Sequence, residues 1–409
     1  MRVLIVAPNI SMRMGGEAVL PFHYIREFKK ARADWIAITH ARVRDELISS
    51  EIYVADRFYF IEDSPLEKMV HRLGRLAPGA IREKVFLTLI AAITSARLAK
   101  YARALARTLN VDVIHQTTPV SPKFPSFLTN MPAPVIIGPM NGGMEYPPAF
   151  KNEYAQGSGA TIAIARAFSG IANTIAPGKK HAAKILVANE RSRKALPGGI
   201  DPVRVSTIVE NGVDLDLWSP NAAEKSSEPI FVFVGRLVWL KGVELMIEAF
   251  ARAPSNARLV IIGDGPERAR FEQAANQSSA ADRIEFLGFR PQSEIKKFLG
   301  RATALILPSL RECGGSVILE AAACGTTSIA TDWGGPKDYI TSDTGILVAP
   351  DGREEFILGL TAAITQLAED VALAKQLGER ASANVEASFS WRAKAQRMIE
   401  IYEDAAPNP

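Results

Sequence analysis

Two pairs of charged residues in the second half of the chain have the types and spacing needed to bind a phosphorylated ligand. Arg236 and Lys241 follow the apolar segment IFVFV, and Glu312 and Glu320 stand on either side of a Gly-Gly turn. Arginine binds phosphate through paired hydrogen bonds, lysine adds a point charge, and a carboxylate accepts hydrogen bonds from hydroxyls. Single loop cations often have no role, but a position directly after a buried strand favours binding. A sugar nucleotide carries both a diphosphate and hydroxyls, and it is the ligand predicted here.

The Gly-Gly turn itself is the second element of this predicted site. Backbone N–H groups that lead into a helix can face phosphate or sugar oxygens. The residues expected to do so are Gly314, Gly315, Ser316 and Val317. Glu320 falls about one turn inside the predicted helix, facing a ribose, and Glu312 precedes the turn, facing the transferred sugar. The helix macrodipole alone favours a glutamate near a helix N-terminus, which explains one glutamate but not the whole loop.

The segments that must position these residues are apolar strands that alternate with helices, in two series. The first series contains RVLIVAP, VDVIHQ, PVIIGP and KILVAN. The second contains VSTIVE, IFVFVG, RLVIIGD, RIEFLGF, ALILPS and TSIATD. Helices are expected at Gly242–Arg252, Pro266–Gln277, Ser293–Leu299 and Val317–Cys324. This alternation predicts an α/β protein with parallel sheets, whose carboxyl edges carry the polar groups.

Length and composition indicate two globular domains. The chain has 409 residues, 47% hydrophobic and 22% charged, which is too long for one ordinary core. We expect an N-terminal domain over residues 1–205 and a C-terminal domain over 206–385. Residues 386–409 are expected to form a helix that packs back on the N-terminal domain.

The two cysteines, Cys313 and Cys324, have no metal-ligand spacing, which favours a reducing compartment. The N-terminus starts directly with a strand, so no signal peptide is expected, and the apolar run Val85–Ala96 is too short to span a bilayer. A cytoplasmic protein is therefore predicted. No nucleic-acid partner is expected.

Charge is distributed unevenly along the chain. Residues 1–205 contain 28 Lys+Arg and 16 Asp+Glu, a balance of +12, which leaves −8 for the remainder of a chain of net charge +4. Part of the excess lies in a predicted helical hairpin, residues 64–109, where residues 68–107 hold nine basic residues and one acidic residue. Apolar residues at helical spacing accompany them, so the hairpin could lie on an anionic membrane, peripheral to its inner face. Packing as an ordinary helical layer is the alternative.

Several motifs together resemble the retaining glycosyltransferases of family 4, which have the GT-B fold. They are VGRLVWLKG, NGVD at Asn211–Asp214, GDGPER, FLGF, the spaced glutamates and the following EAAACG. The resemblance implies two Rossmann-like domains that face a central cleft, with the nucleotide-sugar donor held mostly by the C-terminal domain. It also implies that no metal or other cofactor is needed, because Arg236 and Lys241 do the work of a divalent ion. Phe289, in FLGF, joins the expected donor site.

One departure from the family concerns the donor loop. Where an E-G-F-G-L-P run is common, this chain has Glu312 followed by Cys-Gly-Gly-Ser-Val. The aromatic residue and the proline are missing, so the wall around the donor sugar differs and the sugar cannot be named.

In the first half, the resemblance assigns further roles. Gly15 and Gly16 occupy the glycine-rich loop after the first strand and would face the donor phosphate, although a tight turn alone also explains them. His115 ends VDVIHQ and would bond a hydroxyl near the reacting sugar, whereas a lone histidine is usually structural. The expected acceptor residues are Asn141, Gly142, Gly143 and Asn189.

The sequence thus predicts a metal-independent retaining hexosyltransferase that uses a glycan acceptor, expected to be lipid-linked, in bacterial-type polysaccharide or envelope synthesis. A nucleotide-sugar epimerase of the same fold is one alternative, but no dense cluster of carboxylates and histidine stands in the first half. A non-catalytic nucleotide-sugar-binding protein is another. A Rossmann dehydrogenase is disfavoured because the first strand is not followed by G-x-G-x-x-G.

Overall fold

The computed structural model describes residues 1–79, 82–151, 172–220, 228–253 and 256–406. These residues form two compact units, called here the N-terminal unit and the C-terminal unit. The N-terminal unit comprises Met1–Gly143, a segment that ends at Glu210, and the chain from Lys394 onward. The C-terminal unit comprises Asn211–Ala393 and a segment that begins at Met144. Each unit is therefore built from segments that are far apart in the sequence.

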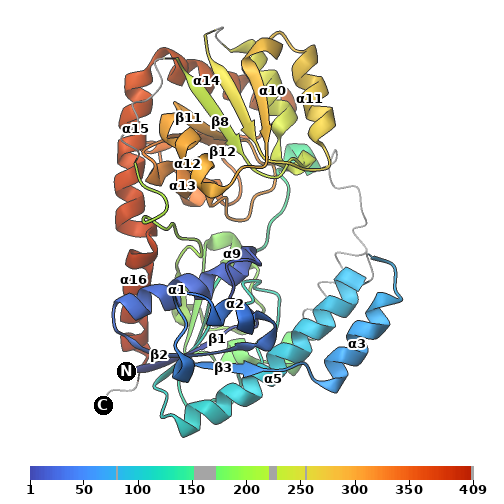
Figure 1. The fold of residues 1–409 in the computed structure, drawn as a ribbon, viewed down its shortest axis with the longest axis vertical. Helices are drawn as coiled ribbons and strands as arrows, with labels where there is room; N and C mark the ends of the chain where they lie inside the picture. The colour runs from blue at the N-terminus through green and yellow to red at the C-terminus, as the bar shows by residue number, and fades with distance from the viewer. Residues whose placement is uncertain (80–81, 152–171, 221–227, 254–255, 407–409) are drawn as a thin grey trace. The chain divides into compact units, whose positions relative to one another are not determined.

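A seven-stranded parallel sheet forms the centre of the N-terminal unit (Figure 1), in the order β3-β2-β1-β4-β5-β6-β7. The strands are β1 (Arg2–Val6), β2 (Asp34–His40), β3 (Phe58–Ile61), β4 (Val113–Gln116), β5 (Val135–Met140), β6 (Lys184–Val187) and β7 (Val205–Thr207). The central strands are buried along nearly their whole length, as expected for a parallel sheet covered on both faces. All neighbouring strands run parallel, so the loops that follow them meet at one edge.

Helices cover both faces of this sheet. They are α1 (Val19–Lys30), α2 (Arg44–Ile48), α3 (Pro65–Arg75), α5 (Leu87–Thr108), α8 (Gly178–His181), α9 (Glu190–Lys194) and α16 (Trp391–Ala405). Most of α16 belongs to the N-terminal unit, which it joins at Lys394. Its side chains Met398, Ile401 and Tyr402 are buried there.

The predicted basic hairpin is present. Helix α3 begins at a complete capping box, in which the Ser64 hydroxyl accepts from the Glu67 N–H and the Glu67 carboxylate accepts from the Ser64 N–H. A π-helical turn at Arg82–Phe86 leads into α5, and α3 packs against α5 (Figure 1). Residues 80–81, where the second helix of the hairpin was expected to begin, lie outside the described residues.

The C-terminal unit is built on a six-stranded parallel sheet in the order β10-β9-β8-β11-β12-β13. The strands are β8 (Ile230–Val234), β9 (Arg258–Ile262), β10 (Ile284–Gly288), β11 (Ala304–Leu307), β12 (Thr327–Thr331) and β13 (Gly345–Val348). The helices are α10 (Val243–Arg252), α11 (Arg268–Gln277), α12 (Gln292–Arg301), α13 (Val317–Ala323), α14 (Arg353–Glu369) and α15 (Val371–Asn384). The direction in which successive strands are added to the sheet reverses between β8 and β11. In such open sheets ligands bind outside the carboxyl ends of the strands, near this point.

One strand prediction is wrong. VSTIVE was expected to open the second sheet, but its residues Val205–Thr207 form β7, which pairs with β6 at the end of the first sheet. Strands β2, β3 and β13 were not predicted. The four predicted helices are all present, with ends shifted by one or two residues.

Among the described residues, no single helix has the length and the apolar composition to cross a membrane. The two helical segments Arg353–Glu369 and Val371–Phe389 meet those criteria only when taken together, and they are bent by 101° relative to one another.

Candidate functional site

Arg236 lies in the loop that follows β8 of the C-terminal unit. The backbone of this loop is held by the neighbouring strand, because the Leu237 N–H donates to the Asp264 carbonyl at 2.9 Å. The Arg236 side chain is exposed, and no hydrogen bond or ion pair joins it to another described residue. A guanidinium at the carboxyl edge of a parallel sheet is positioned to bind an anion.

Lys241 is held by a sharp turn. It ends the 3₁₀ helix Trp239–Lys241, and Gly242 follows with φ of +66°. A Cβ at Gly242 would lie 2.1 Å from the Pro308 carbonyl oxygen, so only glycine fits here. This close approach fixes the start of α10 against the end of β11, and it aims Lys241 towards the loop after β11.

Lys241 and Glu312 form an ion pair, which brings two of the predicted site residues together. Their side chains are 19% and 13% exposed. The same Glu312 oxygen accepts a hydrogen bond from the Ser309 hydroxyl at 3.2 Å. Both side chains are largely shielded from water but remain accessible. Such a pair is expected to bind a phosphate through the cation and a sugar hydroxyl through the carboxylate.

Gly334 and Gly335, which follow β12, hold the backbone of Glu312 in place. The Gly335 N–H donates to the Glu312 carbonyl at 2.9 Å, and a Cβ at Gly334 would lie 2.4 Å from the same oxygen. Gly315, with φ of +80°, turns the chain back over the Glu312 side chain. The DWGGPKD segment after β12 therefore holds the donor loop.

Glu320 lies in the first turn of α13, as predicted, and is partly buried. This burial raises the pKa of Glu320 to about 7, and a hydrogen bond from the Ser316 hydroxyl partly offsets the rise by favouring the ionised form. Ser316 is itself one of the predicted loop residues, and Val317 begins the helix. Phe289 follows β10 and is 77% exposed.

An aromatic cluster beside this loop was not predicted. The ring of Tyr146, from the segment that begins at Met144, stacks on Trp239 with centroids 5.5 Å apart and an interplanar angle of 27°. The Arg311 guanidinium lies 5.4 Å from the Tyr146 ring centre. The only available signal was that a tyrosine follows the predicted acceptor loop.

In the N-terminal unit, the structure gives His115 internal partners. The ring is fully buried, its Nε2 lies 2.6 Å from the Gly138 carbonyl, and its Nδ1 lies 2.6 Å from the Tyr402 hydroxyl. A carbonyl only accepts, so Nε2 carries the proton and Nδ1 accepts from Tyr402. Burial lowers the pKa of His115 to about 4. Both nitrogens are used inside the fold, and the geometry does not support the expected bond to a sugar hydroxyl.

The predicted acceptor residues gather around Ser192, a buried residue that was not singled out from the sequence. The Ser192 hydroxyl lies 2.8 Å from the Asn189 side-chain oxygen, and the Gly142 N–H donates to the hydroxyl at 3.1 Å. Asn189 also caps α9 through the Ser192 N–H. Gly143, with φ of +72°, packs on the Arg191 carbonyl. These contacts shape the loop after β5.

Asn141 belongs to a buried polar network at the ends of three chain segments. Its amide donates to the Glu210 carboxylate at 2.5 Å, and Lys394 donates to the Val209 carbonyl. Burial lowers the pKa of Lys394 to about 8, partly offset by the charge of Glu210. Glu210 and Lys394 are the residues at which the chain leaves and re-enters the N-terminal unit.

Gly15 and Gly16 have φ of +64° and +56°, and among the described residues no heavy atom beyond their chain neighbours lies within 4 Å of a Cβ placed on either. The loop before them is ordered by Glu46, which accepts from the Met12 N–H at 2.8 Å and the Ser11 hydroxyl at 2.6 Å.

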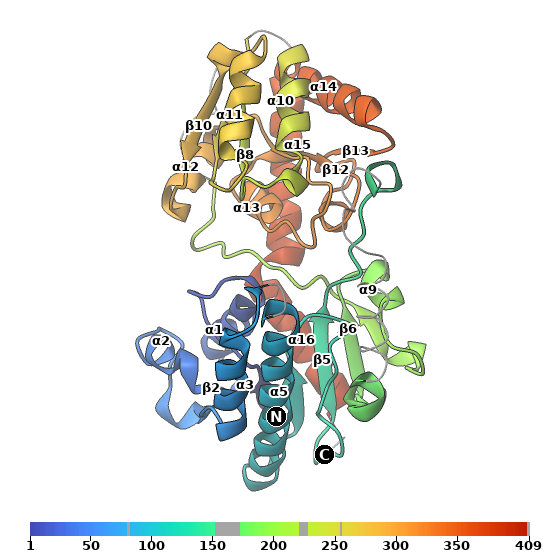
Figure 2. The same cartoon turned by 90° about the vertical axis from the view of Figure 1, so that its right-hand side faces the viewer.

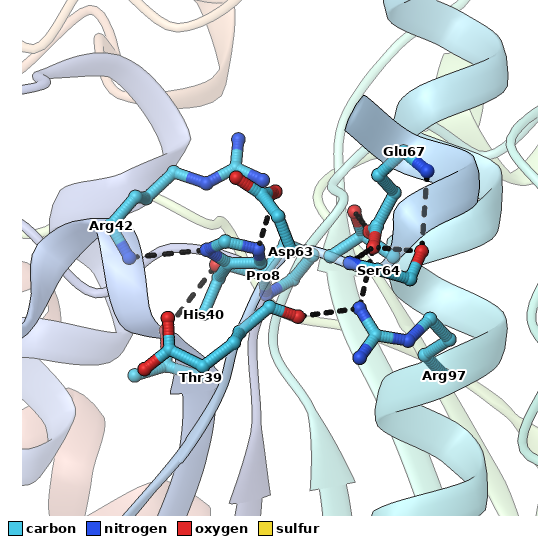
Figure 3. Close-up of polar contacts among 10 residues, drawn as sticks. Pro8, Thr39, His40, Arg42, Asp63, Ser64, Glu67 and Arg97 are labelled. Carbon is cyan, nitrogen blue, oxygen red and sulfur yellow. Dashed lines mark hydrogen bonds and ion pairs between the residues drawn. The ribbon is translucent and has the colours of Figure 1, made fainter. Parts of the chain in front are cut away.

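One group of the described residues, His40, Asp63 and Glu67, could bring metal-ligand atoms within 4.8 Å of one another. In Figure 3 the Glu67 carboxylate already accepts from Ser64 and from the Arg97 guanidinium. His40 accepts the Arg42 N–H through Nδ1 and faces Asp63 through Nε2 at 3.1 Å. A guanidinium on the same carboxylate disfavours a cation, so these contacts anchor α3 to the edge of the sheet.

Comparison with known proteins gives sequence matches in the C-terminal half of the chain. Residues 216–383 match the family model of the glycosyl transferases group 1. Over 229 residues the chain is 33% identical to D-inositol 3-phosphate glycosyltransferase of Corynebacterium glutamicum, covering 51% of this chain and 53% of that protein. It is 32% identical over 223 residues to alpha-maltose-1-phosphate synthase of Mycolicibacterium smegmatis, covering 50% and 57%. The chain spans about half the length of the curated relatives that it matches.

Solved structures match over nearly the whole chain. HepE of Anabaena in complex with UDP has a TM-score of 0.68 at 18% identity, covering 99% of this chain and 100% of that one. Sucrose-phosphate synthase of Thermosynechococcus elongatus has a TM-score of 0.66 at 20% identity, covering 98% of each chain. These likenesses confirm the predicted GT-B fold of two parallel α/β domains, and the named transferases and synthases do not favour the epimerase alternative.

Proposed function

We propose that this protein is a retaining glycosyltransferase that moves a hexosyl residue from a nucleoside diphosphate sugar to a hydroxyl of a glycan acceptor. The observation that carries the proposal is the Lys241–Glu312 ion pair at the carboxyl edge of the second sheet. It lies inside the segment that matches the glycosyl transferases group 1. The sequence comparisons support glycosyl transfer as the reaction class, and the donor, the acceptor and the stereochemistry are parts of the proposal.

In the proposed reaction the bond between the sugar C1 and the diphosphate oxygen breaks, and a bond from C1 to the acceptor oxygen forms on the same face. The acceptor proton passes to the departing phosphate. Negative charge grows on that phosphate as the bond breaks, and Arg236 with Lys241 stabilises it. We propose that this pair of cations takes the place of a metal ion, and that no cofactor is required.

The donor would rearrange the ion pair rather than disrupt it. Phosphate oxygens would share the Lys241 ammonium, and sugar hydroxyls would donate to Glu312, which keeps the pairing partly intact. Glu320 would accept from the ribose hydroxyls, while Gly314, Gly315 and Ser316 would offer backbone N–H groups. UDP-glucose is the first donor to test, because HepE of Anabaena, which shares the fold, has been solved with UDP-glucose.

The acceptor is proposed to bind the N-terminal unit through the loop after β5, whereas Gly15 and Gly16, after β1, would face the donor phosphate. In this proposal Asn141 and Asn189 shape the acceptor loop through Ser192, and His115 acts by holding Gly138 and α16 in place. The role of His115 is thus positional.

We further propose a cytoplasmic enzyme that works at the inner face of a membrane on a lipid-linked acceptor. Helix α3 leaves Leu66, Met69, Leu73 and Leu76 exposed, and the first turns of α5 leave Leu87 and Leu89 exposed. Exposed basic residues stand among them. An apolar stripe flanked by cations suits the boundary between acidic headgroups and acyl chains.

Turnover of a donor panel tests the function. Proton NMR should show release of the sugar from one of UDP-glucose, UDP-N-acetylglucosamine or GDP-mannose, in EDTA, with the α-linked configuration kept in the first product. The first appearance of a β-configured product would contradict retention. Binding of a donor without any turnover, with simple glycans and membrane extracts as acceptors, would favour the non-catalytic binding protein.

A further inference from the structure

A short segment joins the two units and is built into the C-terminal unit. After β5 the chain passes from the N-terminal unit, at Gly143, to the C-terminal unit, at Met144. In Figure 2 the segment lies near α14, where Phe150 is buried and meets the Phe356 ring edge-to-face at 6.1 Å. The Trp333 indole N–H donates to the Glu145 carbonyl at 2.9 Å. The segment is therefore anchored at both ends of the stretch that carries Tyr146.

Tyr146 lies between two loops of the predicted donor site. One face of its ring stacks on Trp239, in the 3₁₀ turn that ends at Lys241. The Arg311 guanidinium, next to Glu312 in the chain, also lies against the ring, at 5.4 Å. Offset stacking and cation–π contacts are both attractive and directional, so the ring holds Trp239 and Arg311 at a set spacing.

The same two loops meet a second time through the Lys241–Glu312 ion pair. Trp239 is two residues before Lys241, and Arg311 is one residue before Glu312. The aromatic contact and the ion pair therefore act on the same pair of loops at adjacent points. After Glu312 this loop has Cys313 and two glycines, and so no aromatic residue of its own. Tyr146 supplies an aromatic ring to that loop from another part of the chain.

We propose that Tyr146 is a positioning residue of the donor site, which sets the spacing between Lys241 and Glu312 through its contacts with Trp239 and Arg311. This inference rests on the proposed function. The ring has no acid–base task, so its value lies in alignment of the cation and the carboxylate on the donor. Loss of alignment at a reacting centre lowers turnover more than it lowers ground-state binding.

The test compares Tyr146→Leu and Tyr146→Phe with wild type, using UDP-glucose or whichever donor of the panel is turned over. Leu358→Ala is the control, because Leu358 is 53% exposed on α14 of the C-terminal unit and belongs to no proposed site. Tyr146→Leu should lower kcat by about tenfold to a hundredfold, with KM and the Kd of the bare nucleoside diphosphate changed far less. Tyr146→Phe keeps the stack and should restore turnover. Leu358→Ala should equal wild type.

Arg311→Gln is the second variant, since it removes the contact between the guanidinium and the Tyr146 ring and leaves the buried Phe150 anchor intact. It should lower kcat in the same direction as Tyr146→Leu, and thermal melting should show that both variants are folded. Wild-type kcat in both variants would overturn the positioning role while leaving the proposed function standing. An equal loss of bare-nucleotide affinity and turnover would also overturn it, because that result marks general damage to the loop. A wild-type protein that binds no nucleoside diphosphate would overturn the proposed function and this inference together.

Discussion

The affinity for the donor should depend on pH through Glu320. Burial raises the pKa of this carboxyl to about 7, and only the ionised form accepts two hydrogen bonds from the ribose hydroxyls. Binding that requires the ionised form has an apparent Kd divided by the ionised fraction. With a pKa near 7, that fraction rises from about one-tenth at pH 6 to about nine-tenths at pH 8. The donor should therefore bind about tenfold more tightly at pH 8 than at pH 6, a difference of about 1.4 kcal/mol.

Isothermal titration calorimetry with UDP-glucose between pH 6 and 8 measures this effect. The diphosphate of a sugar nucleotide does not titrate in this range, unlike the terminal phosphate of UDP. No histidine occurs in Asn211–Ala393, so no imidazole of that segment contributes to the pH dependence of Kd. Titrations in two buffers of different ionisation enthalpy should also show release of most of one proton at pH 6.

Glu320→Gln should bind the donor more weakly at pH 8 and lose the pH dependence, because an amide does not ionise. Glu379→Gln, on the exposed surface of α15, is the matched control and should keep the wild-type profile. A flat wild-type profile, or a Glu320→Gln variant that still varies tenfold, would refute the assignment of Glu320 to the ribose.

Three further predictions follow from the same structure. Glu312→Gln should cut turnover by about a hundredfold. Bare UDP should nevertheless bind this variant at least as tightly as it binds wild type, because Lys241 loses its partner and is available to phosphate. Steady-state kinetics and calorimetry on the same variant check this, and a matched loss of UDP affinity would count against it. The hairpin of α3 and α5 should bind liposomes only when they contain acidic lipid, and less at high salt; equal recovery with neutral liposomes in a flotation assay would remove the membrane proposal. Tyr402→Phe should destabilise the protein by about 1–3 kcal/mol in urea unfolding, since the buried Nδ1 of His115 loses its donor, and an unchanged midpoint would show that this bond adds nothing.

The C-terminal sheet was largely predictable because its strands are buried on both faces and read as continuous apolar runs, as in β8 and β11. Strand β2 was missed since Trp35, Thr39 and His40 interrupt the aliphatic pattern, although all three are buried. The three-residue strand β7 was assigned to the wrong sheet. A strand so short carries no pattern that says which neighbour it pairs with.

The meeting of Lys241 with Glu312 was implied by the sequence, because both residues follow strands of one parallel sheet. The contacts of His115 could not be predicted, since its partner Tyr402 is 287 residues away and reaches it only through the packing of α16. Tyr146 was missed for the same reason. Its contact with Trp239 depends on the path of the chain between units, and local periodicity carries no information on that path.

The central claim is that Arg236 and Lys241 bind the diphosphate of a sugar nucleotide without a metal ion, and calorimetry on the double variant Arg236→Ala/Lys241→Ala tests it most directly. Wild type should bind UDP or GDP in EDTA, and the double variant should bind the same nucleotide at least a hundredfold more weakly, the scale of lost charge stabilisation at a phosphate. Lys375→Ala/Arg380→Ala, a pair of exposed cations on α15, should bind as wild type does. Binding that appears only with Mg²⁺ or Mn²⁺, or a double variant with wild-type affinity, would contradict the claim.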